Sequence, residues 1–183
     1  MKQFLLQMSG LPGSGKSTIA RQVGARYGAA VVDLDVIRSA VLDGGVSVEA
    51  SGRVAYPVMY ELTRSLLAQG LSVVIDSPCG YDEIVTTGRA IADERDVAYK
   101  YVELVTDDLT LIDGRLRTRV PLRSQRRAIN VHAIDAGDTD PDGHQLFQTW
   151  LHRTKRPSEG YLQVDSAQPV DLILTEVDSY LDL

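Results

Sequence analysis

The residues best suited to do chemistry stand together in one short stretch, GLPGSGKST, at positions 10–18. It matches the pattern G-x-x-x-x-G-K-[ST], with Gly10, Gly15, Lys16 and Ser17 at the fixed positions. Glycines let successive main-chain N–H groups point at one anion, and a helix that begins there adds the positive end of its dipole. The lysine supplies a point charge for the outer phosphates, and the next hydroxyl is a ligand for Mg²⁺. The stretch therefore predicts a nucleotide site with ATP and Mg²⁺ as cofactors.

The sequence on either side of this loop is of the kind that such a site requires. The apolar run FLLQM at 4–8 predicts a strand that leads into the loop, and Ile19, Val23 and Tyr27 recur at every fourth position after it. That spacing predicts one face of a helix that ends near Gly28. The residues expected to contact the nucleotide are Gly10, Pro12, Gly13, Ser14, Gly15, Lys16, Ser17 and Thr18.

Three aspartates stand at the ends of predicted strands, where α/β proteins bind their ligands. Asp33 and Asp35 lie in VVDLDVIR, and Asp76 lies in VVIDSP. Asp35 and Arg38 are three residues apart, so they share a face once a helix begins. Phosphoryl transfer needs a carboxylate that takes the proton of an acceptor hydroxyl and a cation that offsets charge, roles that suit Asp35 and Arg38. Asp76 is a candidate to hold a water of the magnesium shell.

Each of these residues also has a purely structural interpretation. Asp35 is a favoured residue type for a helix N-cap, and Arg38 is then a solvated arginine. Asp76 suits a turn before Pro78 equally well.

A strip rich in arginine, RLRTRVPLRSQRR, follows at 115–127 and contains no acidic residue. Arg115 and Arg119 are four residues apart, and we expect them on a helical lid that closes over the triphosphate and stabilises the charge of the transition state. Arg123 competes for the contact with phosphate. The alternative is a solvated basic face or a patch that binds nucleic acid. The arginines of this strip are residues 115, 117, 119, 123, 126 and 127.

The elements that would position these residues alternate between strands and helices, which predicts a single α/β domain over residues 1–183 with a mainly parallel sheet. Helices are expected over 48–69, with a break or restart at Pro57, and over 82–95. Residues 107–169 are expected to form a helical lid rather than a second domain. The remaining strands are expected at 30–34, 71–76, 97–105 and 171–176, the last followed by a short terminal helix.

Composition limits the kinds of partner that this chain binds. Its net charge of −6 does not favour polyanions, and its one cysteine, Cys79, suits a cytoplasmic location. No stretch approaches the ~20 apolar residues that span a bilayer, so no membrane partner is expected.

The DTDPDG stretch at 138–143 opens like a calcium loop, but Thr149 stands where the bidentate glutamate belongs. The histidines lack the spacing of a zinc site.

The segments GLPGSGKST, DLDVIR, GLSVVIDSP and RLRTR together resemble the small P-loop kinases of the nucleoside-kinase type. The nearest groups are polynucleotide-kinase-like, zeta-toxin-like and antibiotic-phosphotransferase-like proteins, which often carry only an ATP-binding or AAA-type description. The resemblance implies a P-loop NTPase three-layer sandwich with strand order 2-3-1-4-5. It also implies that Asp35 is the catalytic base, that Arg38 steadies the acceptor, and that Asp76 ends the third strand.

Two further implications come from the same resemblance. The D-x-D at 33–35 is similar to shikimate-kinase-like enzymes, in which the first aspartate, here Asp33, orients a magnesium water. The chain departs from those enzymes because it has DSPCG where they carry a glycine triplet, which argues against a shikimate-like substrate. Residues 165–169 stand where kinases of this group contact adenine, or they form an ordinary surface turn.

The expected function is ATP- and Mg²⁺-dependent transfer of a phosphoryl group to a hydroxyl of a small metabolite or antibiotic-like molecule. A polynucleotide 5′-hydroxyl is the second acceptor class, although aromatic residues for base stacking are scarce at 6%. A nucleotide-driven switch or NTPase without an acceptor is the alternative from another class.

Overall fold

The computed structural model describes residues 2–136 and 142–181. Its centre is a five-stranded parallel sheet in the order β2-β3-β1-β4-β5, which confirms the expected topology. All four strand pairs are parallel, so the carboxyl ends of the strands meet at one edge, from which the loops that bear functional residues emerge. The strands are β1 (Phe4–Gly10), β2 (Ala30–Asp33), β3 (Val73–Asp76), β4 (Ala98–Val105) and β5 (Leu162–Asp165).

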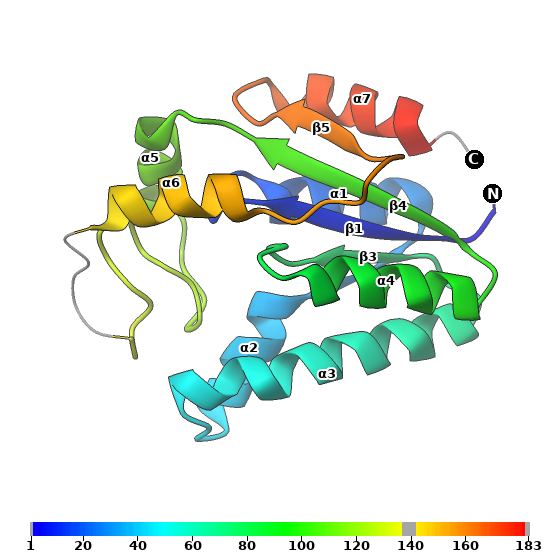
Figure 1. The fold of residues 1–183 in the computed structure, drawn as a ribbon, viewed down its shortest axis with the longest axis horizontal. Coiled ribbons are helices and arrows are strands. Elements are labelled where there is room, and N and C mark those ends of the chain that lie inside the picture. Colours follow the sequence, from blue (N-terminus) through cyan, green and yellow to red (C-terminus); the bar gives the residue numbers. More distant parts are fainter. Residues whose placement is uncertain (1, 137–141, 182–183) are drawn as a thin grey trace.

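Helices cover both faces of this sheet and give the expected three layers (Figure 1). Alternate residues of β1 serve opposite faces, since Leu6 and Met8 join the core under α1 and α7, whereas Leu5 joins the core under α3 and α4. Both cores consist mainly of fully buried aliphatic side chains. The helices are α1 (Lys16–Tyr27), α2 (Leu34–Asp43), α3 (Val48–Ala68), α4 (Asp82–Glu94), α5 (Leu109–Thr118), α6 (Gly143–Arg153) and α7 (Val170–Leu181).

The expected strand at 171–176 is wrong, because these residues lie in α7. The apolar run there is the middle of a helical stripe in which Ile173, Leu174, Val177 and Leu181 are buried. The last strand is β5, which comes earlier in the chain and falls within the 107–169 range expected for the lid. Its four residues are too few to give a clear alternating pattern.

The expected break at Pro57 is also wrong, because α3 runs through it without interruption. Proline removes one N–H from the helix ladder and leaves the carbonyl four residues earlier, that of Arg53, without its donor. Both Arg53 and Pro57 are exposed, so water can satisfy that carbonyl.

A small separate core holds α5 and α6 beyond the carboxyl ends of the strands, on the left of the molecule in Figure 1. Leu11 from the loop after β1 packs there with Ile112 and Leu116 of α5 and with Phe147 of α6. This core therefore ties the glycine loop to the elements that carry the arginine strip. No helix among the described residues is long and apolar enough to cross a bilayer.

Candidate active site

The glycine loop connects β1 to α1 and has the left-handed backbone that its glycines predict. Gly10, Gly13 and Gly15 have φ values of 133°, 85° and 97°, a region that other residues rarely adopt. A Cβ on Gly10 would lie 2.4 Å from the main-chain oxygen of Leu104 and 2.8 Å from the Ser14 hydroxyl. The first glycine is thus required for close packing against β4 as well as for its conformation.

The loop leaves several main-chain donors available for an anion. In the described part of the chain, the N–H groups of Gly13, Gly15, Lys16 and Ser17 have no protein acceptor. Two of these belong to the first turn of α1, where a helix has unsatisfied donors and the positive end of its dipole. The loop therefore offers converging N–H groups and positive potential, the combination that binds phosphate.

Lys16 reaches back over this loop. Its Nζ donates to the main-chain oxygens of Gly10 and Leu11 over 2.8 and 2.9 Å, and the residue is only 9% exposed. Burial lowers the pKa of Lys16, while the nearby carboxylates of Asp76 and Asp35 act in the opposite direction. An ammonium held only by neutral carbonyls within a few ångströms is well placed to exchange them for phosphate oxygens.

Asp33 and Asp76 stand side by side at the ends of β2 and β3, where they are register partners. Burial raises the pKa of Asp33 to about 6, and the neighbouring Asp76 and Asp35 add to this effect. Burial also raises the pKa of Asp76, against the effects of Lys16 and of the Ser17 hydroxyl. Asp76 is 4% exposed, and its Oδ2 has no hydrogen-bond partner among the described residues. The predicted metal-supporting residues are therefore close together and hold unused acceptor capacity.

Asp35 lies in the first turn of α2, two residues beyond the end of β2. The N-cap of α2 is Asp33, whose carboxylate accepts the main-chain N–H groups of Asp35 and Val36. The side chain of Asp35 is thus not needed as a cap. The N-cap role that the sequence allowed for Asp35 belongs to Asp33 instead.

The carboxylate of Asp35 is held by two residues that the sequence analysis did not single out. Gln125 donates its Nε2 to Asp35 Oδ2 over 2.9 Å, and Ser124 donates its hydroxyl to Oδ1 over 3.2 Å. Ser39 is bonded to the main chain and hydroxyl of Ser124, which fixes that turn against α2. The only local signal was the polar pair inside the arginine strip, and nothing in it pointed to Asp35.

The structure separates the predicted arginines into distinct positions. Arg119 is the C-cap of α5, and burial lowers its pKa while the carboxylates of Asp35 and Asp33 act in the opposite direction. Arg115 donates to the main-chain oxygen of Ser14 in the glycine loop over 3.4 Å and to that of Ser166 over 2.8 Å. Arg115 therefore lies at the glycine loop, and Arg119 lies near the carboxylates of Asp35 and Asp33.

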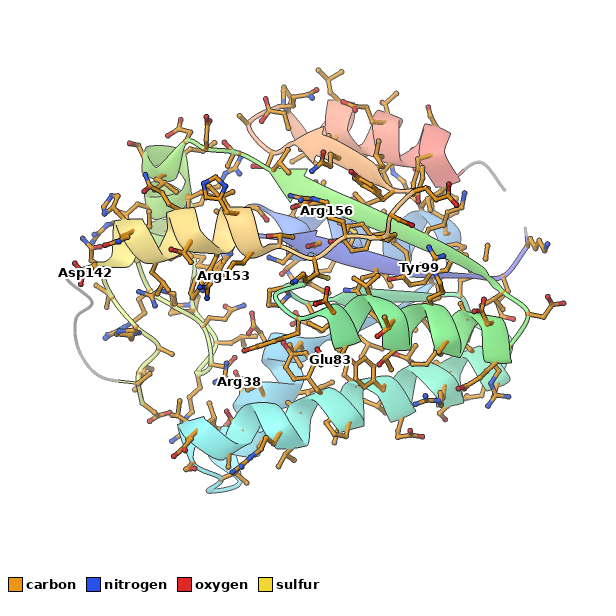
Figure 2. All side chains as sticks on the ribbon, in the orientation of Figure 1. Arg38, Glu83, Tyr99, Asp142, Arg153 and Arg156 are labelled. Carbon is orange, nitrogen blue, oxygen red and sulfur yellow. The ribbon has the colours of Figure 1, made fainter. Side chains whose placement is uncertain are left out.

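Arg38 and Arg123 lie farther out, near the loop that follows α5. Arg38 extends from α2 towards this loop and donates its Nε to Ser51 Oγ over 2.8 Å (Figure 2). Arg123 is bonded to Asp43 and to Asp135, which makes it part of a surface ion-pair cluster rather than a contact for phosphate. Arg117 is likewise paired, with Asp113.

Other predicted features lie at the margin of the site or outside the described residues. Residues 165–169 form the turn from β5 to α7, next to the Ser166 oxygen that Arg115 binds. The acidic stretch at 138–143 falls largely on residues 137–141, outside the described part, and only its last two residues are seen, at the start of α6. No cluster of three or more histidine, cysteine or acidic ligands occurs among the described residues.

A second group of interacting residues that sequence reasoning missed is centred on Glu103 and Arg156. Glu103 of β4 is 3% exposed and accepts Nε and Nη2 of Arg156 over 2.5 and 3.1 Å, together with Nε2 of Gln163. Figure 2 shows Arg156 on the segment that connects α6 to β5. In the same segment, the Lys155 N–H donates to the Cys79 oxygen over 2.7 Å. These bonds fasten the segment to β4 and to the β3–α4 turn.

Residues 5–138, more than half of the chain, match the AAA_33 family model, which is described as an AAA domain. The chain belongs to this AAA-domain family. This chain is also 32% identical over 156 residues to uncharacterized proteins of Mycobacterium tuberculosis (strain ATCC 25618 / H37Rv) and Mycobacterium bovis (strain ATCC BAA-935 / AF2122/97). Each match covers 78% of this chain and 31% of the relative, so the chain spans about a third of the length of the curated relatives it matches.

Solved structures share the fold of this AAA_33 chain at low sequence identity. A Chloroflexus aurantiacus j-10-fl protein superposes with a TM-score of 0.76 at 17% identity, covering 99% of this chain and 100% of that one. The Mycobacterium tuberculosis APS kinase in complex with AMPPNP and APS gives 0.67 at 18%, covering 100% and 99%. A gluconokinase from Sinorhizobium meliloti 1021 gives 0.62 at 19%, covering 97% and 90%. The AAA_33 chain thus has the fold of small P-loop kinases.

The residues at the glycine loop of the AAA_33 chain suit a magnesium nucleotide. Four buried polar atoms in or beside the loop lack a partner within the described residues, as a ligand-binding cradle requires: Ser14 Oγ, Asp76 Oδ2, Arg119 Nε and Ser166 Oγ. A hydroxyl and carboxylates are oxygen ligands of the kind that Mg²⁺ prefers, with phosphate oxygens and waters completing its shell. Ser17 would hold the metal directly, and Asp33 or Asp76 would hold it through water.

Proposed function

We propose that this chain is an ATP- and Mg²⁺-dependent kinase that phosphorylates a hydroxyl group of a small molecule. The observation that carries the proposal is that the Lys16 ammonium, bonded to the glycine loop, and the Asp35 carboxylate, at the start of α2, interact electrostatically. The two residues come from different strand ends, yet each lies within electrostatic reach of the other. A phosphate-binding ammonium beside a carboxylate is the arrangement that transfer to a hydroxyl needs.

In this proposal the nucleotide is held by main-chain donors of the loop and by Lys16. Ser17 would hold Mg²⁺, which would supply neutralisation of charge on the phosphate oxygens. Asp33 and Asp76, at the ends of β2 and β3, would hold the metal through water. Because both carboxylates are buried and adjacent, they favour a nearby cation.

Asp35 takes the proton of the acceptor hydroxyl as that oxygen forms its bond to the γ-phosphorus and the bond to the ADP oxygen breaks. Gln125 and Ser124 keep the Asp35 carboxylate in one orientation, since each of its oxygens accepts one of their hydrogen bonds. Arg119 and Arg115 supply positive charge beside the phosphates, in the role of the transition-state cation. Arg38 orients the acceptor from the outer side of α2.

Three findings support a small-molecule acceptor over a polynucleotide. The solved structures with this fold include a gluconokinase and an APS kinase. The chain has a net charge of −6, which does not attract a polyanion. Two of the six arginines of the strip, Arg117 and Arg123, are paired with acidic residues, which reduces the positive charge that the strip offers to a polyanion.

The decisive experiment follows the label of γ-³²P-ATP with and without a pool of hydroxyl compounds. We expect label to appear in an organic phosphate and ADP release to rise only with acceptor. Asp35→Asn should lower the transfer rate by ~10²–10⁴ while leaving nucleotide affinity unchanged, because only the general base is lost. Asp93→Asn, on the exposed face of α4, is the matched control and should behave like the parent.

Two results would reject the proposal. Acceptor-independent release of inorganic phosphate at the full rate would identify an NTPase or a switch instead. Equal transfer rates for Asp35→Asn and the parent would remove Asp35 from the mechanism.

A further inference from the structure

A cavity of about 200 Å³ lies beside the proposed base, between the α2–α3 pair and the loop that follows α5. Ser124 belongs to its wall and is the same residue whose hydroxyl donates to Asp35 Oδ1. Arg38, which also lines the cavity, is one helical turn beyond Asp35. The cavity therefore adjoins Asp35 through Ser124, and it can receive the rest of a molecule whose hydroxyl is held at Asp35.

The size of the cavity limits what can enter. Pockets for drug-sized ligands are roughly 300–1,000 Å³. A space of about 200 Å³ suits a small metabolite, and it is too small for an oligonucleotide end with its neighbouring bases or for a multi-ring antibiotic. The apolar residues of its lining are Leu42, Val48, Ala133, Ala136 and Trp150.

The charged side chains of the cavity wall have a positive excess, with Arg38, Arg123 and Arg126 against Asp135. Arg123 contributes little to this excess because it binds both Asp135 and Asp43. Arg126 lies against the Trp150 ring, with its guanidinium carbon 5.7 Å from the ring centroid, which holds a cation beside this lining residue.

Arg38 differs from Arg123 because its protein partners are neutral. It donates Nε to Ser51 Oγ over 2.8 Å and Nη2 to the main-chain oxygen of Val48 over 3.4 Å. No carboxylate of the described residues lies within 4.0 Å of its guanidinium. A half-buried guanidinium with neutral partners and a free edge is well suited to bind an oxyanion in two-pronged fashion.

Resting on the proposed kinase function, we infer that the acceptor is a small hydroxyl compound that carries an oxyanion, either a carboxylate or a phosphate monoester, and that Arg38 binds this oxyanion in the cavity. The acceptor hydroxyl lies at Asp35 and the anion lies one helical turn away. The positive wall disfavours cationic acceptors such as amino sugars, because the one carboxylate of the lining, Asp135, is already paired with Arg123.

The chain carries a built-in reporter for this test, since Trp150 lines the cavity and is the only tryptophan in the sequence. Its fluorescence is titrated at constant ionic strength with matched pairs of probes. D-galactonate and galactitol differ in a carboxylate, and glycerol 3-phosphate and glycerol differ in a phosphate monoester. Titrations are repeated in Lys16→Met, so that binding of phosphate at the glycine loop cannot account for the signal.

We expect a saturable change with at least one anionic probe and none with its neutral partner. Arg38→Gln should weaken that binding about 10- to 100-fold, since it loses a charge-assisted hydrogen bond. Arg38→Lys, which keeps the charge without the planar fork, should fall between Arg38→Gln and the parent. Arg53→Gln, at an exposed position of α3, should bind like the parent.

The inference is overturned if neither anionic probe gives a saturable signal, if the neutral probes bind equally well, or if Arg38→Gln binds as the parent does. Stronger binding of 1-amino-1-deoxygalactitol or of an oligonucleotide 5′ end would also overturn it. Failure of the kinase proposal is seen separately, as loss of label transfer in the γ-³²P-ATP assay. Anion binding without transfer would leave the cavity assignment standing and remove the kinase function.

Discussion

Replacing Arg156 by methionine tests whether the buried carboxylate of Glu103 depends on its guanidinium partner. The side chain of Glu103 is 4% exposed, whereas that of Arg156 is 32% exposed. The two form a two-pronged pair, with Nε and Nη2 of Arg156 2.5 and 3.1 Å from the two carboxylate oxygens. After the replacement, Gln163 remains as a donor to Glu103, over 2.9 Å.

The expected cost follows from that asymmetric burial. Breaking a fully buried ion pair costs about 3–5 kcal/mol, because the remaining charge is left uncompensated. The partial exposure of Arg156 lets water approach the vacated site, so we expect the lower figure of about 2–3 kcal/mol. For a chain of this length, each kcal/mol lowers Tm by about 2–4 °C, which predicts a fall in Tm of ~4–12 °C.

Thermal unfolding followed by circular dichroism at pH 7 measures this fall. Arg153→Met, at an exposed position near the end of α6, is the matched control and should shift Tm by less than about 2 °C. The double variant Glu103→Gln with Arg156→Met should regain most of the lost stability, since no buried charge is left unpaired. If Arg156→Met unfolds at the temperature of the control, or if the double variant is no more stable than the single one, the reasoning is refuted.

Two further predictions concern the glycine loop and its neighbours. Lys16→Met should weaken binding of Mg²⁺-AMPPNP about 10- to 150-fold, because charged hydrogen bonds contribute ~1.5–3 kcal/mol each; calorimetry that shows unchanged affinity would exclude Lys16 from the phosphate site. Asp33 has a folded-state pKa of about 6 against an ordinary 3.8, so its contribution to stability is full below pH 3.8 and is lost as pH rises to 6. Asp33→Asn, which keeps a capping side chain and cannot ionise, should therefore gain up to ~3 kcal/mol on the parent between pH 4 and pH 7, measured by urea unfolding in EDTA. A difference between variant and parent that does not change with pH would contradict that pKa.

The glycine loop could be predicted because it depends on local sequence, whereas the strand order was predicted only from the resemblance to small P-loop kinases. The strand before the loop, the three glycines of the loop and Lys16 follow one another in the sequence. The backbone conformation of the loop could therefore be predicted from neighbouring residues. The surroundings of Asp35 could not be predicted in the same way. Ser124 and Gln125 are 89 and 90 residues away from it in the chain, and only the packing of the loop after α5 against α2 brings them into contact.

The arginine strip is a second case in which the sequence predicted local spacing but not long-range contacts. Its spacing correctly indicated that Arg115 and Arg119 share one turn, since the Arg119 N–H donates to the Arg115 oxygen. The sequence could not show which arginines meet acidic partners. Arg123 binds Asp43, which lies 80 residues earlier at the end of α2, and so its charge is used outside the phosphate site.

The fit of Gly13 against α5 limits how this region can move. A single added methyl group at Gly13 would lie 3.1 Å from the Ile112 oxygen and 3.2 Å from the Leu116 side chain. Arg115 adds bonds to the Ser14 and Ser166 oxygens. The glycine loop and α5 are thus closely packed and hydrogen-bonded, so we expect them to move together and any movement of the rest of the arginine strip to begin beyond Thr118, where α5 ends.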